Sequence, residues 1–134
     1  ELDQLRENKK ITPFSGTTAI LNKDNQAIWF SKNILPAIRK EETLRKKETL
    51  SPVYQHIGLY AFKLDALRQF VSFPESPYEK LEGLEQLRLL ENGLSIHAEI
   101  VNHDKAGITS GIDTPEDLAR AEKFIKQMRK ENKC

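Results

Sequence analysis

Short runs in which apolar and polar residues alternate predict the β-strands of this chain. Two apolar-rich runs, Thr17 to Leu21 and Gln26 to Phe30, are separated by Asn22 to Asn25, whose residue types favour a turn. This stretch therefore predicts a β-hairpin. Alternating residue types from Tyr54 to Ala61 and from Leu94 to Val101 predict two further strands, each with two different faces.

Helical spacing and capping residues predict helices around these strands. Residues 1–10 predict a short polar helix, and residues 65–70 predict another with an apolar side. Ser76 is a good N-cap followed by a first-turn proline, which predicts a helix that runs to Glu91. A last helix is expected after Thr114, which opens a capping sequence ahead of an apolar stripe.

The order of these elements, β-β-loop-β-α-α-β-α, predicts an α/β fold in which residues 1–134 form a single domain. The segment 31–52 contains Pro36, has mixed charges and few apolar residues, and ends at Pro52, so it is expected to be a mobile loop. A helical turn is expected inside it, over 40–49.

Composition narrows the range of functions. The 21 basic residues nearly cancel the 20 acidic ones, so the chain lacks the basic field that drives binding to nucleic acid. No apolar run approaches the roughly 20 residues that cross a bilayer, so no membrane association is expected. The single cysteine, Cys134, cannot form an internal disulfide, which fits a reducing compartment such as the cytoplasm.

His56 and Tyr60 form the first candidate site, because both lie on the same face of the predicted strand. Gly58 lies between them, and a glycine inside a strand often marks a place where another group approaches closely. A core histidine that is hydrogen-bonded to the backbone is an equally good interpretation of His56.

A second candidate lies on the predicted helix over 76–91. Each residue turns a helix by about 100°, so Glu82, Glu85 and Gln86 fall within one polar arc, with leucines on the opposite side. This arc either faces a pocket or simply faces water, and the second is the commoner arrangement for glutamates on an amphipathic helix.

Asp113 is the candidate metal ligand. It lies where a predicted strand meets a helix that Thr114 already caps, so its carboxylate is free to bind a hard cation such as Mg²⁺, which needs one or two carboxylates besides substrate oxygens. The alternative is that Asp113 acts as a second capping acid near the helix dipole. The sequence has no glycine-rich phosphate loop, nucleophile elbow, C-x-x-C or H-E-x-x-H motif.

Four segments together resemble the C-terminal half of the 3-deoxy-manno-octulosonate cytidylyltransferase family. They are Phe30 to Pro36, His56 to Tyr60, Ser76-Pro77 followed by Leu84 to Gly93, and Gly111 to Leu118. The resemblance implies the C-terminal portion of a nucleotidyltransferase α/β sandwich with a mixed, mostly parallel sheet, in a homodimer. It also implies transfer of CMP from CTP to the eight-carbon acidic sugar 3-deoxy-manno-octulosonate (Kdo), with release of pyrophosphate, for bacterial lipopolysaccharide.

The resemblance also implies roles for individual residues. Four residues would line the Kdo pocket: His56, Tyr60, Glu85 and Gln86. Asp113 would be one of two aspartates that hold Mg²⁺. Lys32 stands where the family usually has an arginine, and Arg39 where a second basic residue reaches the sugar acid. Lysine keeps the positive charge but lacks the two-pronged geometry of a guanidinium.

The CTP-binding half of the family has no counterpart in this sequence. We therefore expect this chain to be the sugar-binding and dimerising half of a longer enzyme, from a split gene, a proteolytic cut or a truncation. It would be inactive until the other half is present. Two alternatives are a dimerising remnant that binds no substrate and a cytidylyltransferase for another acidic sugar.

Overall fold

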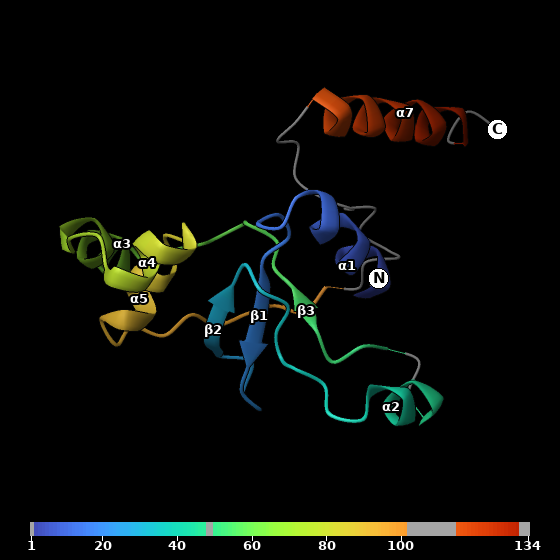
Figure 1. Cartoon of the computed structure of the whole chain (residues 1–134). Coiled ribbons are helices and arrows are strands. Elements are labelled where there is room, and N and C mark those ends of the chain that lie inside the picture. Colours follow the sequence, from blue (N-terminus) through green and yellow to red (C-terminus); the bar gives the residue numbers. More distant parts are fainter. Residues whose placement is uncertain (1, 48–49, 102–114, 132–134) are drawn as a thin grey trace. The chain divides into compact units, whose positions relative to one another are not determined.

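The computed structural model describes residues 2–47, 50–101 and 115–131. The chain divides into two compact units, residues 1–100 and 101–134. The first unit holds α1 (Leu2–Ile11), β1 (Thr18–Leu21), β2 (Ala27–Ser31), α2 (Glu41–Lys47), β3 (Tyr54–Gln55), α3 (Leu64–Ser72), α4 (Pro77–Glu82) and α5 (Leu87–Glu91), and the second holds α7 (Pro115–Glu131) (Figure 1). No helix in the described ranges is both long and apolar enough to span a membrane.

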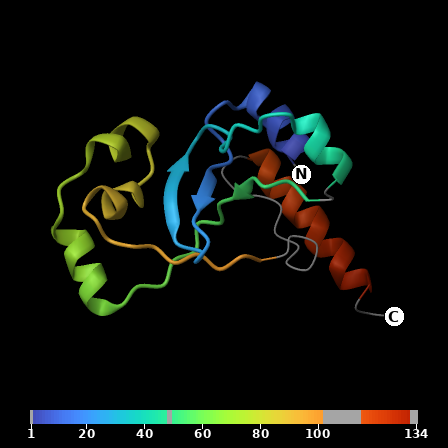
Figure 2. The same cartoon turned by 90° about the horizontal axis from the view of Figure 1, so that it is seen from below.

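The predicted hairpin is confirmed. β1 and β2 pair antiparallel, with Ala19 opposite Phe30, and they lie side by side in Figure 2. The side-chain oxygen Oδ1 of Asn22 accepts hydrogen bonds from the backbone N–H groups of Asp24 and Gln26, both at 2.9 Å. This Asx turn reverses the chain, as the residue types of the turn predict.

The α/β mixture is confirmed, but the expected mostly parallel pairing is not. The described strands form a sheet in the order β2-β1-β3, and both strand pairs are antiparallel. Short connections explain this arrangement of β1 and β2, because a tight turn joins antiparallel strands while parallel neighbours need a long crossover.

The strand predicted over 54–61 is wrong beyond Gln55. In the antiparallel register Gln55 pairs with Thr18, the first residue of β1, so later residues run past the start of that strand. One further bond forms, from the His56 N–H to the Thr17 carbonyl at 2.9 Å. The ladder then ends because β1 offers no more partners.

The strand predicted over 94–101 is reduced to a single bridge between His97 and Gln26. Two backbone bonds flank it, from the Ala27 N–H to the Ile96 carbonyl and from the Ala98 N–H to the Asn25 carbonyl, both 2.8 Å. Residues 96–98 pair with the start of β2, the edge strand of the hairpin, next to the turn. The ladder is short because it reaches only the end of its partner strand.

The helix predicted from Ser76 to Glu91 is wrong as a continuous element, because it breaks into α4 and α5 at Gly83. Gly83 adopts the left-handed conformation, with φ +63° and ψ +43°, and its N–H donates to the Glu79 carbonyl at 2.8 Å. Glycine adopts positive φ without steric cost, so it ends α4. The break removes the polar arc, since Glu82 and Glu85 no longer share a helix.

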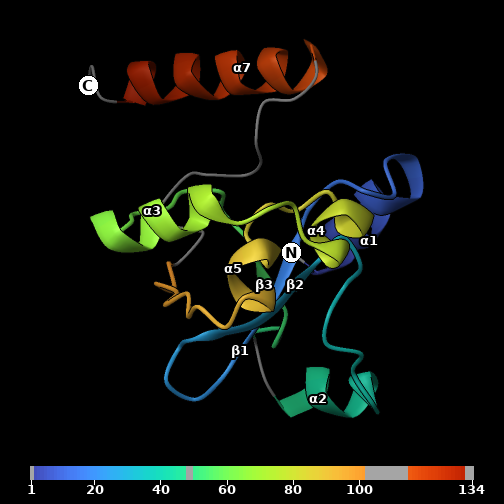
Figure 3. The same cartoon turned by 90° about the vertical axis from the view of Figure 1, so that its left-hand side faces the viewer.

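The core lies between the hairpin and the α4–α5 turn. Its buried side chains are Ala19, Phe30, Leu84 and Leu87, and Leu87 is fully buried. Figure 3 shows α5 next to β2, in agreement with the contacts between these two elements. The polar helix at the start and the helices after residues 64 and 114 are confirmed as α1, α3 and α7.

The segment 31–52, predicted to be a mobile loop, contains α2. Two arginines attach this helix to α1. Arg6 donates two hydrogen bonds to the carboxylate of Glu41, at 2.8 and 2.7 Å, and Arg45 reaches both Glu41 and Asp3. The mobility of the segment stays a prediction.

Candidate functional site

His56 and Tyr60 are brought together by the chain that leaves β3. The Tyr60 hydroxyl and His56 Nε2 lie 2.7 Å apart, a hydrogen bond across four residues. Both side chains are partly buried, and the imidazole packs edge-to-face on Phe30, with ring centroids 5.2 Å apart. His56 and Tyr60 therefore lie together, as the predicted strand suggested, but the backbone that joins them is irregular and not a strand.

Burial keeps both rings neutral. Desolvation lowers the pKa of His56, the negative charge of Glu85 opposes this change, and the positive charge of Lys32 reinforces it. Desolvation also raises the pKa of Tyr60, and Glu85 adds to that rise. Near neutral pH the pair therefore offers an uncharged imidazole and an uncharged phenol, which bind polyhydroxylated molecules through hydrogen bonds.

Glu85 and Lys32 thus reach the His56–Tyr60 pair electrostatically from two other segments. Glu85 lies in the turn that precedes α5 and is exposed, while Lys32 directly follows β2 and is partly buried. One negative and one positive charge therefore influence the same imidazole.

Gln86 follows Glu85 in the sequence and is a buried polar side chain. It is only 2% exposed, and neither its Nε2 nor its Oε1 has a hydrogen-bond partner among the described residues. An unpaired buried amide costs free energy, on the order of 1–3 kcal/mol per group in mutational data. A group of this kind is suited to a ligand that both donates and accepts hydrogen bonds.

Arg39 and Asp113 are not joined to this cluster. Arg39 is exposed, and within the described ranges no hydrogen bond or ion pair connects it to His56 or Tyr60. Asp113 lies outside the described residues. The described part of the chain contains no group of three or more histidine, cysteine, aspartate or glutamate residues that could hold a metal ion.

Sequence reasoning missed the role of Glu82, which it placed on the polar arc with Glu85. In the structure Glu82 accepts hydrogen bonds from the Ser31 hydroxyl and the Lys32 backbone N–H, both at 2.7 Å. These partners lie about 50 residues away in the sequence. No local pattern signals such a contact.

Comparison with known proteins identifies the family. A profile described as cytidylyltransferase matches residues 2–131. The chain belongs to the cytidylyltransferase family. The match covers almost the whole chain, so it includes every segment that carries the resemblance described above.

Curated relatives of this cytidylyltransferase chain are named 3-deoxy-manno-octulosonate cytidylyltransferase. The one from Maricaulis maris is 39% identical over 122 residues, which cover 91% of this chain and 44% of the relative. The one from Phocaeicola vulgatus is 46% identical over 110 residues, covering 81% of this chain and 41% of the relative. The chain thus spans less than half the length of these relatives.

A solved structure of CMP:2-keto-3-deoxy-manno-octonic acid synthetase complexed with CTP shares the fold. It matches this cytidylyltransferase chain with a TM-score of 0.69 at 24% identity, over 95% of this chain and 56% of that protein. The likeness establishes the nucleotidyltransferase fold for this chain.

Proposed function

We propose that this chain is the acidic-sugar-binding half of a 3-deoxy-manno-octulosonate cytidylyltransferase. The complete enzyme would transfer CMP from CTP to Kdo, forming CMP-Kdo and releasing pyrophosphate. Family membership and the names of the relatives support this function. The structural observation that carries it is the hydrogen-bonded His56–Tyr60 pair, whose imidazole is under the electrostatic influence of Glu85 and Lys32.

Each residue has a role suited to a sugar acid. The neutral His56–Tyr60 pair offers hydrogen bonds to sugar hydroxyls, and Glu85 accepts hydrogen bonds from others. The buried amide of Gln86 both donates and accepts, which fits a hydroxyl that does the same. Lys32 supplies the positive charge for the sugar carboxylate, and Arg39 is proposed as a second basic contact from the exposed loop before α2.

Nucleotide binding and metal binding are proposed to depend on residues beyond this chain. Mg²⁺ remains a proposal from the resemblance, with Asp113 as its ligand. The described residues do not form a metal site by themselves. We therefore assign no reaction step through Mg²⁺ to the groups described above. Likewise, the chain spans about two fifths of its relatives, and the site for the CTP phosphates is proposed to lie in the part of the enzyme that these residues do not cover.

The assembly and compartment are further parts of the proposal. The resemblance supports a homodimer joined through this half. The lone Cys134 and the family's use of a soluble nucleotide support a cytoplasmic location.

Calorimetric titration of the purified chain with Kdo tests the proposal. Binding is expected in the wild type and is expected to fall at least roughly tenfold in Gln86→Leu, which removes the amide. The same variant is expected to melt at a higher temperature, because an apolar group of similar size replaces an unpaired buried amide. Gln69→Leu, at an exposed position of α3, is the matched control and should leave affinity unchanged.

Three results would contradict this proposal. Binding of a different sugar acid in place of Kdo would favour a cytidylyltransferase for that sugar. Absence of binding to any sugar acid would favour a non-catalytic dimerising remnant. If Gln86→Leu binds Kdo as tightly as the wild type, Gln86 does not contact the sugar.

A further inference from the structure

The backbone of Lys32 is held from both sides by charged groups that belong to other elements. On the amide side, Glu82 of α4 accepts the Lys32 N–H at 2.7 Å. On the carbonyl side, Lys9 of α1 donates its ammonium to the Lys32 carbonyl oxygen. The Lys32 backbone thus lies between the Glu82 carboxylate of α4, which follows it in the sequence, and the Lys9 ammonium of α1, which precedes it.

Glu82 binds more than this single amide. Its second carboxylate oxygen accepts from the Ser31 hydroxyl at 2.7 Å, and the same hydroxyl accepts from the Asn33 N–H at 2.9 Å. Ser31 is buried, with 2% of its surface exposed. Both oxygens of Glu82 are therefore used on consecutive residues, a geometry that a single exposed ion pair does not provide.

Thr18 of β1 fixes the far end of the same segment. Its hydroxyl donates to the Asn33 carbonyl at 2.7 Å and accepts from the Leu35 N–H at 3.1 Å. Thr18 is fully buried. Residues 31–35 have no regular structure beyond the end of β2, so these side chains provide the bonds that a strand would otherwise provide.

We propose that Glu82 is a positioning residue that, together with Lys9, fixes the Lys32 peptide so that the Lys32 side chain faces the proposed sugar-acid site. Glu82 ends α4, three residues before Glu85, so the same short segment that carries Glu85 also anchors Lys32. The identity of the ligand rests on the proposed function. The contacts that hold the Lys32 backbone form without any ligand.

The charge of Lys32 on the His56 imidazole provides a readout without ligand. This charge lowers the pKa of His56. If Glu82→Gln releases Lys32, the pKa of His56 rises toward its ordinary value, as it does in Lys32→Ala. If Glu82 acted on His56 directly through its own negative charge, Glu82→Gln would lower the pKa of His56 instead. Release of Lys32 and direct loss of the Glu82 charge therefore shift this pKa in opposite directions.

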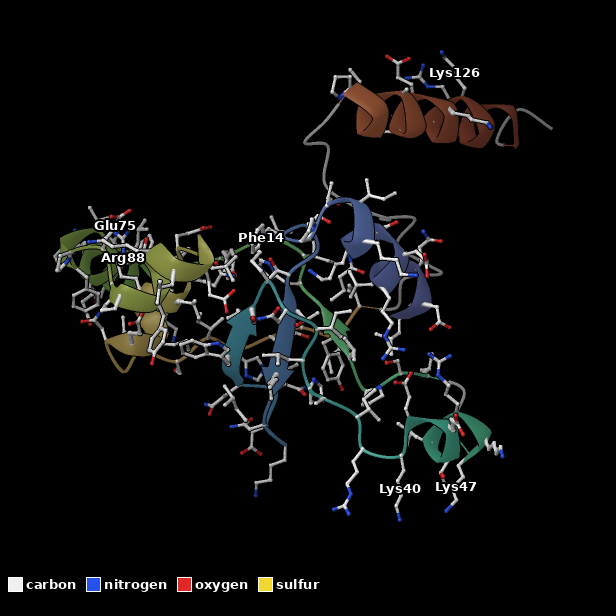
Figure 4. The ribbon with its side chains drawn as sticks, in the orientation of Figure 1. Phe14, Lys40, Lys47, Glu75, Arg88 and Lys126 are labelled. Atoms are coloured by element: carbon white, nitrogen blue, oxygen red, sulfur yellow. The ribbon has the colours of Figure 1, made fainter. Side chains whose placement is uncertain are left out.

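The experiment is a double-mutant cycle followed by NMR titration of His56 in Glu82→Gln, Lys32→Ala and the double variant. Both single variants should raise the pKa of His56, and the double variant should raise it no further than Lys32→Ala alone. Glu75→Gln is the matched control, since Glu75 is an exposed carboxylate in the α3–α4 connection (Figure 4) whose ion pair with Lys80 is long, at 3.9 Å. It should leave His56 unchanged.

Measurements of Kdo binding then test whether the anchor, meaning the contacts of Glu82 and Lys9 with the Lys32 backbone, affects the ligand. Glu82→Gln should weaken Kdo roughly tenfold but should leave the methyl ester of Kdo, which lacks the carboxylate charge, nearly unaffected. An equal loss for both ligands would mean a merely structural role and would overturn the proposal. An unchanged His56 pKa in a folded Glu82→Gln variant would overturn it too.

Two further outcomes separate the anchor from the proposed function. If the wild type binds no Kdo but the His56 titrations behave as expected, the anchor stands and the proposed function fails. If Glu82→Gln does not fold, Lys9→Met removes the other side of the anchor. Because loss of the Lys9 charge would by itself also raise the pKa of a nearby histidine, the anchor predicts a rise in the pKa of His56 when Lys32 is present and no further rise when Lys9→Met is added to Lys32→Ala. An unchanged pKa in Lys9→Met alone would overturn the proposal.

Discussion

Two regions of this molecule use pairs of an arginine and a carboxylate to join helices, yet their surroundings differ. Between α4 and α5, Arg88 donates to both carboxylate oxygens of Glu79, and these side chains are 18% and 7% exposed. Between α1 and α2, Arg45 pairs with Asp3, and these side chains are 47% and 68% exposed. The first pair lies beside the core and the second lies in water.

The surroundings of the α4–α5 pair make it part of a larger network. The Arg88 guanidinium also packs over the ring of Phe70, 4.8 Å from its centroid. Glu91 of α5 accepts from the Ser76 hydroxyl and from the Tyr78 N–H at 3.2 Å, so α5 caps the start of α4. This network fixes the turn that carries Glu85 and Gln86.

The Arg45–Asp3 pair between α1 and α2 is much more exposed to solvent. Pairs between exposed charges contribute little to stability, with a median of about 0–1 kcal/mol, and salt screens them. The side chains of Lys40 and Lys47 at the ends of this region point away from the ribbon (Figure 4). The two contacts use the same pairing chemistry, and we expect the less exposed one to contribute more to the order of its region.

The largest expected effect is in the packing behind the α4–α5 turn. Leu87→Ala should lower the free energy of unfolding by about 2–5 kcal/mol, because it leaves a cavity in the core. Urea unfolding followed through Trp29, the single tryptophan, measures this change. Leu81→Ala, at a side chain 79% exposed, should change it by no more than about 0.5 kcal/mol. Equal losses in the two variants would contradict the placement of the core.

The second prediction compares the two arginines directly. Arg88→Met should lower the urea midpoint clearly more than Arg45→Met, since it leaves the nearly buried carboxylate of Glu79 without its partner. In 1 M salt, where the screening length is about 3 Å, the effect of Arg45→Met should nearly vanish while that of Arg88→Met persists. Equal urea midpoints for Arg88→Met and Arg45→Met, or an equal dependence of the two midpoints on salt, would contradict the difference proposed between the two regions.

The smallest effect concerns acid stability of the α1–α2 contact. Hydrogen bonds from Arg6 and then Arg45 lower the pKa of Glu41 to about 2, from an ordinary value of 4.5. A carboxylate with a lowered pKa stabilises the fold above its unfolded pKa, and this contribution is lost as the pH falls through the folded pKa. The stabilisation is therefore present above about pH 4.5 and is lost toward pH 2.

The measurement for Glu41 is the urea midpoint at several pH values between 7 and 2. Glu41→Gln should lower the midpoint slightly at pH 7 and should show a weaker fall on acidification than the wild type. A parallel pH profile in the two proteins would show that Glu41 does not contribute.

Local sequence predicted those elements that depend on neighbouring residues. The hairpin formed because Asn22 bonds to backbone groups only two and four residues ahead. The contact between His56 and Tyr60 was also within reach of the sequence, since it spans four residues. Both depend on short-range geometry that residue types largely decide.

Strand lengths and the helix break were predicted wrongly for physical reasons. A strand extends only as far as its partner offers free backbone groups, and the partner of Gln55 begins at Thr18. Gly83 lies in a stretch with helical spacing, so periodicity alone could not show that it would take the left-handed conformation. The roles proposed for Arg39 and Asp113 stay predictions.

The sequence by itself determined the α/β composition, the hairpin, the positions of α1, α3 and α7, and the types of side chain available to bind a sugar acid. Only the tertiary structure decided which of these side chains meet. Glu82 accepts hydrogen bonds from Ser31 and Lys32, and the charges of Glu85 and Lys32 act on the pKa of His56 in opposite directions, across separations of tens of residues. Such contacts depend on how the core packs the α4–α5 turn against the hairpin, and no local pattern encodes that packing.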